Sequence, residues 1–124
     1  MIGRRTLLCF VPLLSLAAAP NARAATRIPP QFLGEWDESA QGCVEGDWSS
    51  HLIIRARTIE PYESQGRVKT IKFQGPNAIT TVSRYTFAEG SEIGTDRFTL
   101  SPSRKTLMWF TDGHSARLIR CPAK

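Results

Sequence analysis

The sequence holds few of the side chains that commonly do chemistry. It has two histidines, His51 and His114, and three cysteines. The histidines are far apart and neither has a carboxylate at ligand spacing, so the pattern does not favour a metal site. There is no Gly-x-Ser-x-Gly motif, and two histidines offer little choice of general base. We therefore expect no enzymatic activity, no cofactor and no metal ion.

Pairs of acidic residues are the remaining candidates for acid–base chemistry. Most of them flank predicted turns or point outward from predicted strands, so a solvated surface is the simpler interpretation. The pairs are Glu35/Asp37, Glu45/Asp47, Glu60/Glu63 and Glu89/Glu92. No glycine-rich phosphate loop accompanies them.

Four basic residues on neighbouring predicted strands are a candidate binding patch: Arg55, Arg57, Arg67 and Lys69. Such a patch would suit lipopolysaccharide, an acidic protein or an anionic ligand, and a solvated strand face is the alternative. Tyr62 and Glu63 lie beside Pro61 and a predicted turn at Gln65-Gly66. They are interpreted either as a functional loop at a barrel mouth or as packing at a strand end.

The first 24 residues have the features of a secretory signal peptide. Arg4 and Arg5 precede an apolar stretch at 6–19, and residues 22–24 read Ala-Arg-Ala, a typical cleavage site. The apolar stretch is shorter than the about 20 residues that span a bilayer. We predict cleavage after Ala24, a periplasmic or secreted location, and no transmembrane segment. The paired arginines fit the general secretory route or, more weakly, the twin-arginine route.

Removal of that segment changes the charge and the cysteine count. The formal charge of +5, from 16 basic and 11 acidic residues, becomes +2 over residues 25–124, which keep 13 basic and 11 acidic residues. The apparent basicity is therefore largely that of the leader, and a nucleic-acid partner is not expected. Cys43 and Cys121 remain, and an oxidising compartment favours a disulfide between them, two unpaired thiols being the alternative.

Short β-branched or aromatic runs separated by turn residues recur along residues 25–124, and residues 39–50 are expected to be irregular. The signal Asp112-Gly113 is typical of a two-residue hairpin. We predict one all-β domain, a small antiparallel up-and-down β-barrel of seven or eight strands with Tyr85, Trp109 and Phe110 in its core. The predicted strands are 31–38, 51–57, 58–64, 67–74, 78–88, 93–100, 106–111 and 115–121.

The run Phe32-Leu33-Gly34-Glu35-Trp36 resembles the G-x-W opening of lipocalins and other calycin-type barrels. The resemblance implies that Trp36 closes one end of the barrel and packs against an arginine of the last strand, best matched by Arg120 and next by Arg117. It also implies an alternative function, the carriage of a small apolar ligand in a hollow interior. That function would be excluded by an interior filled by Trp36, Phe73, Phe87, Phe98 and Trp109.

A longer pattern resembles an uncharacterised family of small exported β-barrel proteins of alphaproteobacteria, which implies a fold and a location but no reaction. Its positions are Ile28-Pro29, Phe32, Gly34, Trp36, Cys43, Leu52, Ile54, Tyr62-Glu63-Ser64, Val68 and the terminal Arg-Cys. More distantly, the chain is similar to bacterial metalloprotease inhibitors, whose N-terminal arm enters the protease cleft, although their second cysteine lies mid-chain. Residues 25–30 would be that arm. We expect a non-catalytic periplasmic or secreted binding protein, either an envelope protein-binding module or an inhibitor of a hydrolase such as a protease or lysozyme.

Overall fold

The computed structural model describes residues 3, 25–46 and 48–123, so the predicted signal peptide and its cleavage site lie outside the described residues, Gly3 excepted. A 3-10 helix, η1, and a short α-helix accompany eight strands. In chain order the elements are η1 (Pro30–Phe32), β1 (Gly34–Asp37), α1 (Ala40–Glu45), β2 (Leu52–Ile54), β3 (Thr58–Pro61), β4 (Gln65–Phe73), β5 (Ala78–Phe87), β6 (Gly90–Leu100), β7 (Thr106–Thr111) and β8 (His114–Arg120).

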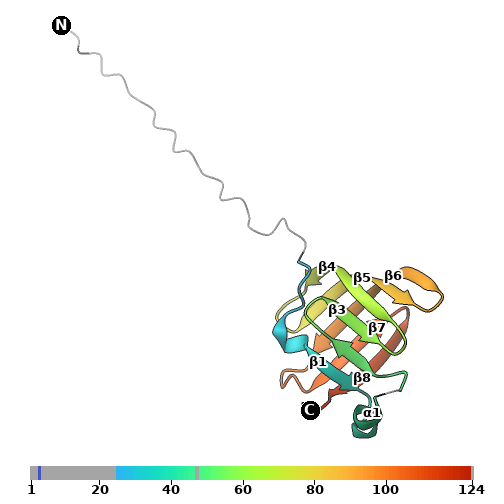
Figure 1. Cartoon of the computed structure of the whole chain (residues 1–124). Coiled ribbons are helices and arrows are strands. Elements are labelled where there is room, and N and C mark those ends of the chain that lie inside the picture. Colours follow the sequence, from blue (N-terminus) through green and yellow to red (C-terminus); the bar gives the residue numbers. More distant parts are fainter. Residues whose placement is uncertain (1–2, 4–24, 47, 124) are drawn as a thin grey trace.

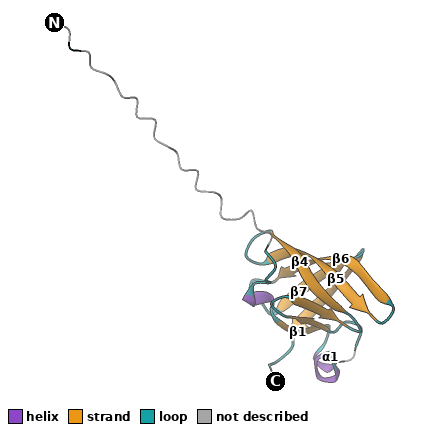
Figure 2. Cartoon of the chain, turned by 45° about the horizontal axis from the view of Figure 1, so that its top comes forward, coloured by secondary structure: helices purple, strands orange, loops and turns teal. Residues whose placement is uncertain are grey.

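The eight strands form one closed antiparallel barrel in which each strand pairs with its neighbours in the chain (Figure 1). β1 pairs with β8 to close the sheet, with Trp36 opposite Arg120 and Asp37 opposite Ile119. A second view shows the strands wrapped around one interior, with the helices outside it (Figure 2). The prediction of an all-β up-and-down barrel is confirmed, and a closed sheet leaves no unpaired edge strand.

The interior of the barrel is filled mainly by apolar side chains. Trp36 and Phe98 are fully buried, and the Phe98 ring stacks on the partly buried Trp109 with ring centroids 6.4 Å apart. Phe73 is 51% exposed, because it lies at the last position of β4, beyond the buried layer. The prediction that Phe110 belongs to the core is wrong: it is 40% exposed because it alternates with the inward-facing Trp109.

Residues 25–33 cover one end of the barrel. Ala25 forms an isolated bridge with Ile71, and the Ile28 amide donates to the Ala56 carbonyl at 2.7 Å. The side chains of Ile28 and Phe32 are buried in the core. The segment that the inhibitor resemblance likens to an inserting arm therefore packs against its own barrel.

Arg120 holds this segment to the last strand. Its guanidinium donates to the carbonyls of Gln31 and Leu33, at 2.7 Å each, and its Cζ lies 4.2 Å from the centroid of the Trp36 ring. Burial lowers the pKa of Arg120, and the charge of Arg104 adds to that shift. The structure thus brings together the two residues that the lipocalin resemblance matched, Trp36 and Arg120.

The predicted disulfide between Cys43 and Cys121 is present, with Cα atoms 5.4 Å apart. Cys43 lies in α1, whose N-cap Ser39 accepts a hydrogen bond from the Gly42 amide at 3.0 Å. The prediction of an irregular segment is therefore wrong over Ala40–Glu45, because six residues are too few to display a helical period. No helix in the described part of the chain is long and apolar enough to cross a membrane.

The predicted strand 51–57 is wrong in its second half. β2 ends at Ile54, and the Arg55 amide donates to the Thr58 carbonyl at 2.9 Å, so the chain turns and β3 runs back beside β2. No Gly, Pro or Asn marks this turn in the sequence. The predicted turn at Gln65-Gly66 is also wrong, because β4 begins at Gln65 and the turn lies at 62–64.

Candidate functional site

A network of polar side chains lies inside the barrel. Asp96, on β6, is 1% exposed. Its Oδ2 accepts a hydrogen bond from the Tyr85 hydroxyl, and its Oδ1 accepts one from Trp109 Nε1 at 2.8 Å. The alternation of β5, β6 and β7 directs these three side chains inward. The network therefore links three consecutive strands from within.

Burial dominates the electrostatics of this network. It raises the pKa of Asp96, against hydrogen bonds from Tyr85, Trp109 and Thr111 that lower it. Burial, together with the neighbouring Asp96, also raises the pKa of Tyr85. The hydroxyls of Thr81 and Ser83 are buried close by without a hydrogen-bond partner among the described residues. This part of the interior therefore favours a neutral carboxyl group.

Tyr85 fits only because glycines face it from both neighbouring strands. A Cβ atom at Gly66 would lie 2.5 Å from Tyr85 Cε1, and one at Gly94 would lie 2.8 Å from the same ring. A side chain at either position would displace the ring that positions Asp96. The close approach of the Tyr85 ring requires a glycine at position 66. Gly66 therefore belongs to the interior of a strand and does not mark the predicted turn.

Asp96→Asn is expected to stabilise the protein progressively as the pH rises. The pKa of Asp96 is raised in the folded state, so wild-type stability is highest below the unfolded pKa and falls as the pH rises through the folded pKa. The variant carries no titrating group at this position, so its advantage over wild type should grow with pH. Urea unfolding across the acidic to neutral range measures this difference, with the exposed Glu89→Gln as control. Parallel pH profiles for wild type and Asp96→Asn would contradict it.

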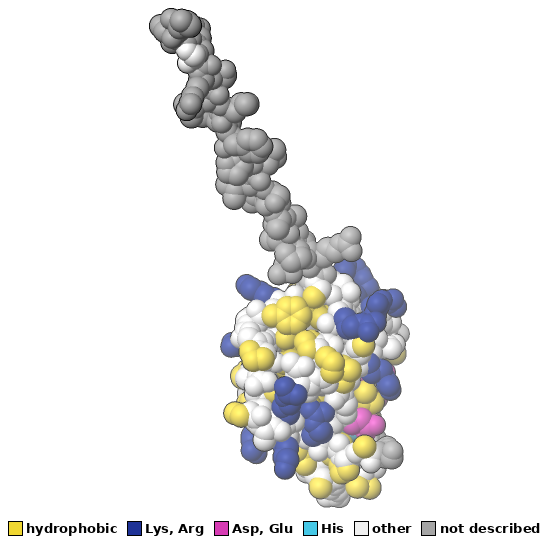
Figure 3. Space-filling view, turned by 90° about the vertical axis from the view of Figure 1, so that its left-hand side faces the viewer, with side chains coloured by type: hydrophobic (Ala, Val, Ile, Leu, Met, Phe, Trp, Pro, Cys, Tyr) yellow, Lys and Arg dark blue, Asp and Glu magenta, His cyan; other side chains and the backbone are white. Residues whose placement is uncertain are grey.

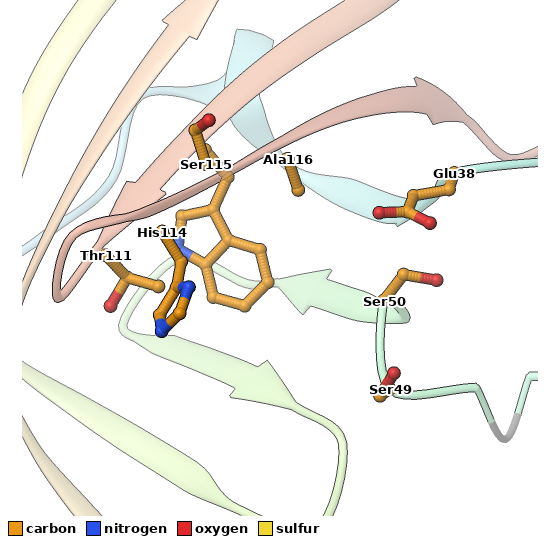
Figure 4. A pocket seen from close by; sticks show the side chains of 8 residues that line it. Glu38, Ser49, Ser50, Thr111, His114, Ser115 and Ala116 are labelled. Atoms are coloured by element: carbon orange, nitrogen blue, oxygen red, sulfur yellow. The ribbon is translucent and has the colours of Figure 1, made fainter.

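A pocket of about 170 Å³ opens at the barrel end nearest this network, against Trp109. Figure 4 shows Glu38 and Ser50 on one side of it and Thr111 and His114 on the other. The pocket is smaller than the roughly 300–1,000 Å³ typical of small-molecule sites. Its lining combines the Trp109 ring and Ala116 with polar Ser, Thr, His and Glu side chains.

A second polar cluster, which the sequence analysis missed, lies beneath α1. Asp37 is fully buried, accepts a hydrogen bond from Ser50 Oγ at 2.7 Å, and lies 2.9 Å from His51 Nδ1. His51 Nε2 lies 3.4 Å from Glu35 Oε2. The prediction that the pair Glu35/Asp37 is solvated is therefore wrong for Asp37. Since Ser50 bonds the carboxylate rather than His51, the cluster lacks the hydroxyl–imidazole contact of a hydrolytic triad.

The outer wall of β4–β7 forms a surface that we call the basic face. It is defined by the exposed side chains Arg67, Lys69, Lys72, Arg84 and Arg97. The acidic residues of these four strands, Glu92 and Asp96, both alternate to the inward side. The outer side of these four strands therefore carries no carboxylate, and Asp112, in the β7–β8 turn, lines a pocket together with Arg97. Figure 3 shows one side of the molecule, where Lys and Arg side chains stand among apolar ones with little acidic surface between them.

The strand register arranges the basic face in rows that run across the strands. Two rows result: Arg67–Arg84–Ile93 and Lys72–Thr80–Arg97–Phe110. In the first row, Arg67 and Arg84 stand directly opposite each other on adjacent strands. Like charges in this position destabilise a sheet, and no acidic neighbour on this face offsets them.

The basic patch predicted from the sequence divides into two parts. Arg67 and Lys69 belong to the basic face, whereas Arg55 and Arg57 lie in the turn between β2 and β3. Arg55 Nε also forms an ion pair with Glu60. Lys72, Arg84 and Arg97 were missed, although strand alternation alone would have placed Arg84 and Arg97 on the outer side.

Tyr62 and Glu63 are exposed in the turn between β3 and β4. With Phe87 and Glu89 they line an open groove of about 500 Å³.

The described residues hold no group of His, Cys, Asp or Glu side chains arranged to bind a metal ion. Comparison with family models, curated proteins and solved structures gave no match for this chain.

Proposed function

We propose that this chain is an exported, non-catalytic binding protein that engages an acidic protein through the basic face. The observation that carries the proposal is the placement of Arg67 opposite Arg84 on the outer side of strands whose carboxylates face the other way. This arrangement costs stability in the free protein, and carboxylates of a partner would offset the repulsion. Because this arrangement lowers the stability of the free protein, a role in binding accounts for it better than a role in folding does.

A protein partner is favoured over a diffuse polyanion because apolar side chains stand in the same rows. Ile93 is 50% exposed beside Arg84, and Phe110 is 40% exposed beside Arg97. Arginine and aromatic residues are enriched where protein interfaces concentrate their binding energy. Inhibition of a protease or lysozyme with an acidic surface is the specific form to test. Since residues 25–30 pack on the barrel, inhibition would come from the basic face.

The disulfide supports export, as does the resemblance of residues 1–24 to a signal peptide. The alternative function, carriage of an apolar ligand, finds less support, because the barrel interior is occupied by Trp36, Phe98 and their neighbours. A single barrel domain over residues 25–124 is consistent with a signal peptide at residues 1–24 and with the one closed sheet formed by β1–β8. The likeness to exported alphaproteobacterial proteins is in keeping with the same location.

Arg84→Glu is expected to change stability and binding in opposite directions. Opposite charges across β4 and β5 should raise the free energy of unfolding by about 0.5 kcal/mol. Loss of a cation from the basic face should weaken binding to an acidic partner by roughly tenfold at low ionic strength. Urea unfolding measures the first effect. Inhibition and binding assays on a panel of purified acidic hydrolases, and on partners captured from a periplasmic extract and then purified, measure the second.

Lys105→Glu is the matched control, since it makes the same charge change in the exposed turn between β6 and β7. It should leave binding within about twofold of wild type. A wild-type protein that binds no acidic protein would contradict the proposed function. Equal losses of binding in Arg84→Glu and Lys105→Glu would also contradict it, because net charge rather than the basic face would then decide affinity.

A further inference from the structure

We propose that the pocket beside the β7–β8 hairpin anchors a carboxylate side chain, Asp or Glu, from an acidic segment of the partner. This inference rests on the proposed function and names the chemistry of one subsite within the basic face. The pocket has a volume of about 360 Å³. The residues that line it include Thr95, Arg97, Phe110, Asp112, His114 and Ser115.

Arg97 is the group that would bind the carboxylate. Its guanidinium carbon lies 6.0 Å from the centroid of the Phe110 ring, on the strand pair where the two residues stand directly opposite. The ion pairs among the described residues involve His51 and Arg55, so Arg97 has no carboxylate partner there. A guanidinium held against an aromatic face keeps its N–H groups available for a bidentate pair with a carboxylate.

The remaining lining suits the same ligand. The hydroxyls of Thr95 and Ser115 and the imidazole of His114 can donate hydrogen bonds to an oxygen beside the guanidinium. The partly exposed ring of Phe110 supplies an apolar wall beside the guanidinium. Asp112 lines the same pocket with a negative charge. That charge repels a phosphate monoester, which carries about −1.5 to −2, more strongly than a singly charged carboxylate.

The test compares substitutions that keep the charge of the basic face. The probe is a fluorescein-labelled oligoglutamate peptide, with an oligoglutamine peptide of equal length as the neutral control, and binding is followed by fluorescence polarisation. Arg97→Lys should weaken oligoglutamate binding by about fivefold, because lysine cannot form the bidentate pair. Arg104→Lys, the matched control in the exposed β6–β7 turn outside the basic face, should leave it within about twofold of wild type, since it also keeps the charge.

Asp112→Asn tests the same pocket with a substitution that should strengthen oligoglutamate binding. Asp112 has a φ of 43° and precedes Gly113 in the hairpin turn. Asn-Gly is a preferred sequence for this turn, so the variant should fold as the wild type does. Removal of the competing negative charge should tighten oligoglutamate binding by about threefold.

The outcomes separate this inference from the function on which it rests. Oligoglutamate binding that Arg97→Lys and Arg104→Lys weaken equally would overturn the anchor site and leave the proposed function standing. Wild-type protein that binds neither oligoglutamate nor any acidic protein would overturn both. Binding of polygalacturonate in preference to oligoglutamate would assign the pocket to an acidic glycan and overturn a protein ligand.

Discussion

Trp36→Ala is expected to lower the free energy of unfolding by about 4 kcal/mol, as large-to-small substitutions of buried aromatic side chains do. Trp36 is fully buried, and its Nε1 donates to the Phe32 carbonyl at 3.1 Å. The guanidinium of Arg120 also stacks over the Trp36 ring. The substitution therefore opens a cavity and removes the surface that holds Arg120 against residues 31–33.

Urea unfolding of residues 25–124, followed by circular dichroism, measures this loss without relying on tryptophan fluorescence. Trp48→Ala is the matched control, because Trp48 is 36% exposed in the connection between α1 and β2. We expect that variant to remain within about 0.5 kcal/mol of wild type. A loss of less than about 1 kcal/mol for Trp36→Ala would contradict the role of Trp36 in closing the barrel.

Removal of the disulfide is expected to cost about 4.5 kcal/mol. Cys43 and Cys121 are separated by 78 residues, and the chain-entropy model gives this value for a loop of that length. Cys43→Ser combined with Cys121→Ser should show the loss in urea unfolding, and wild type in reductant should show a similar one. Reductant should leave the double variant unchanged, which makes that variant its own control.

Mass analysis under non-reducing conditions gives an independent check of the bond. The oxidised protein should be lighter than the reduced protein by two hydrogen atoms. Free thiols at Cys43 and Cys121 in the exported protein would contradict the disulfide. Unchanged stability after reduction would contradict its contribution to the fold while leaving the bond itself in place.

Most ends of the long strands could be predicted from the sequence because turn residues mark them, although β4 and β6 begin two and three residues earlier than predicted. β7 and the Asp112-Gly113 turn match their predicted positions, since strict alternation is followed by a residue pair that specifies the hairpin. The short elements could not be predicted. β2 and β3 have three and four residues, and the turn between them carries two arginines instead of glycine or proline. Periodicity needs more residues than these elements supply.

The candidate site was predictable only in part, for a different reason. Alternation shows which side of a strand a residue occupies, but it does not show the register between strands. Arg67 was recognised as exposed, yet its position opposite Arg84 depends on the β4–β5 register. Asp96 lies two residues from the buried Phe98 and so shares its inward face, but carboxylates are so seldom buried that this signal is easily set aside.

The contacts that close the barrel also bear on when the chain can fold. Arg120 meets the carbonyls of Gln31 and Leu33 across sequence separations of 89 and 87 residues, whereas the hairpins from β4 to β8 join neighbouring segments. Distant pairings pay a large loop-closure entropy and slow the folding rate, so closure should follow the formation of the hairpins. A nascent chain still lacking its last strand has neither the β1–β8 seam nor the disulfide. It would remain an open sheet, without its disulfide, until β8 can pair with β1.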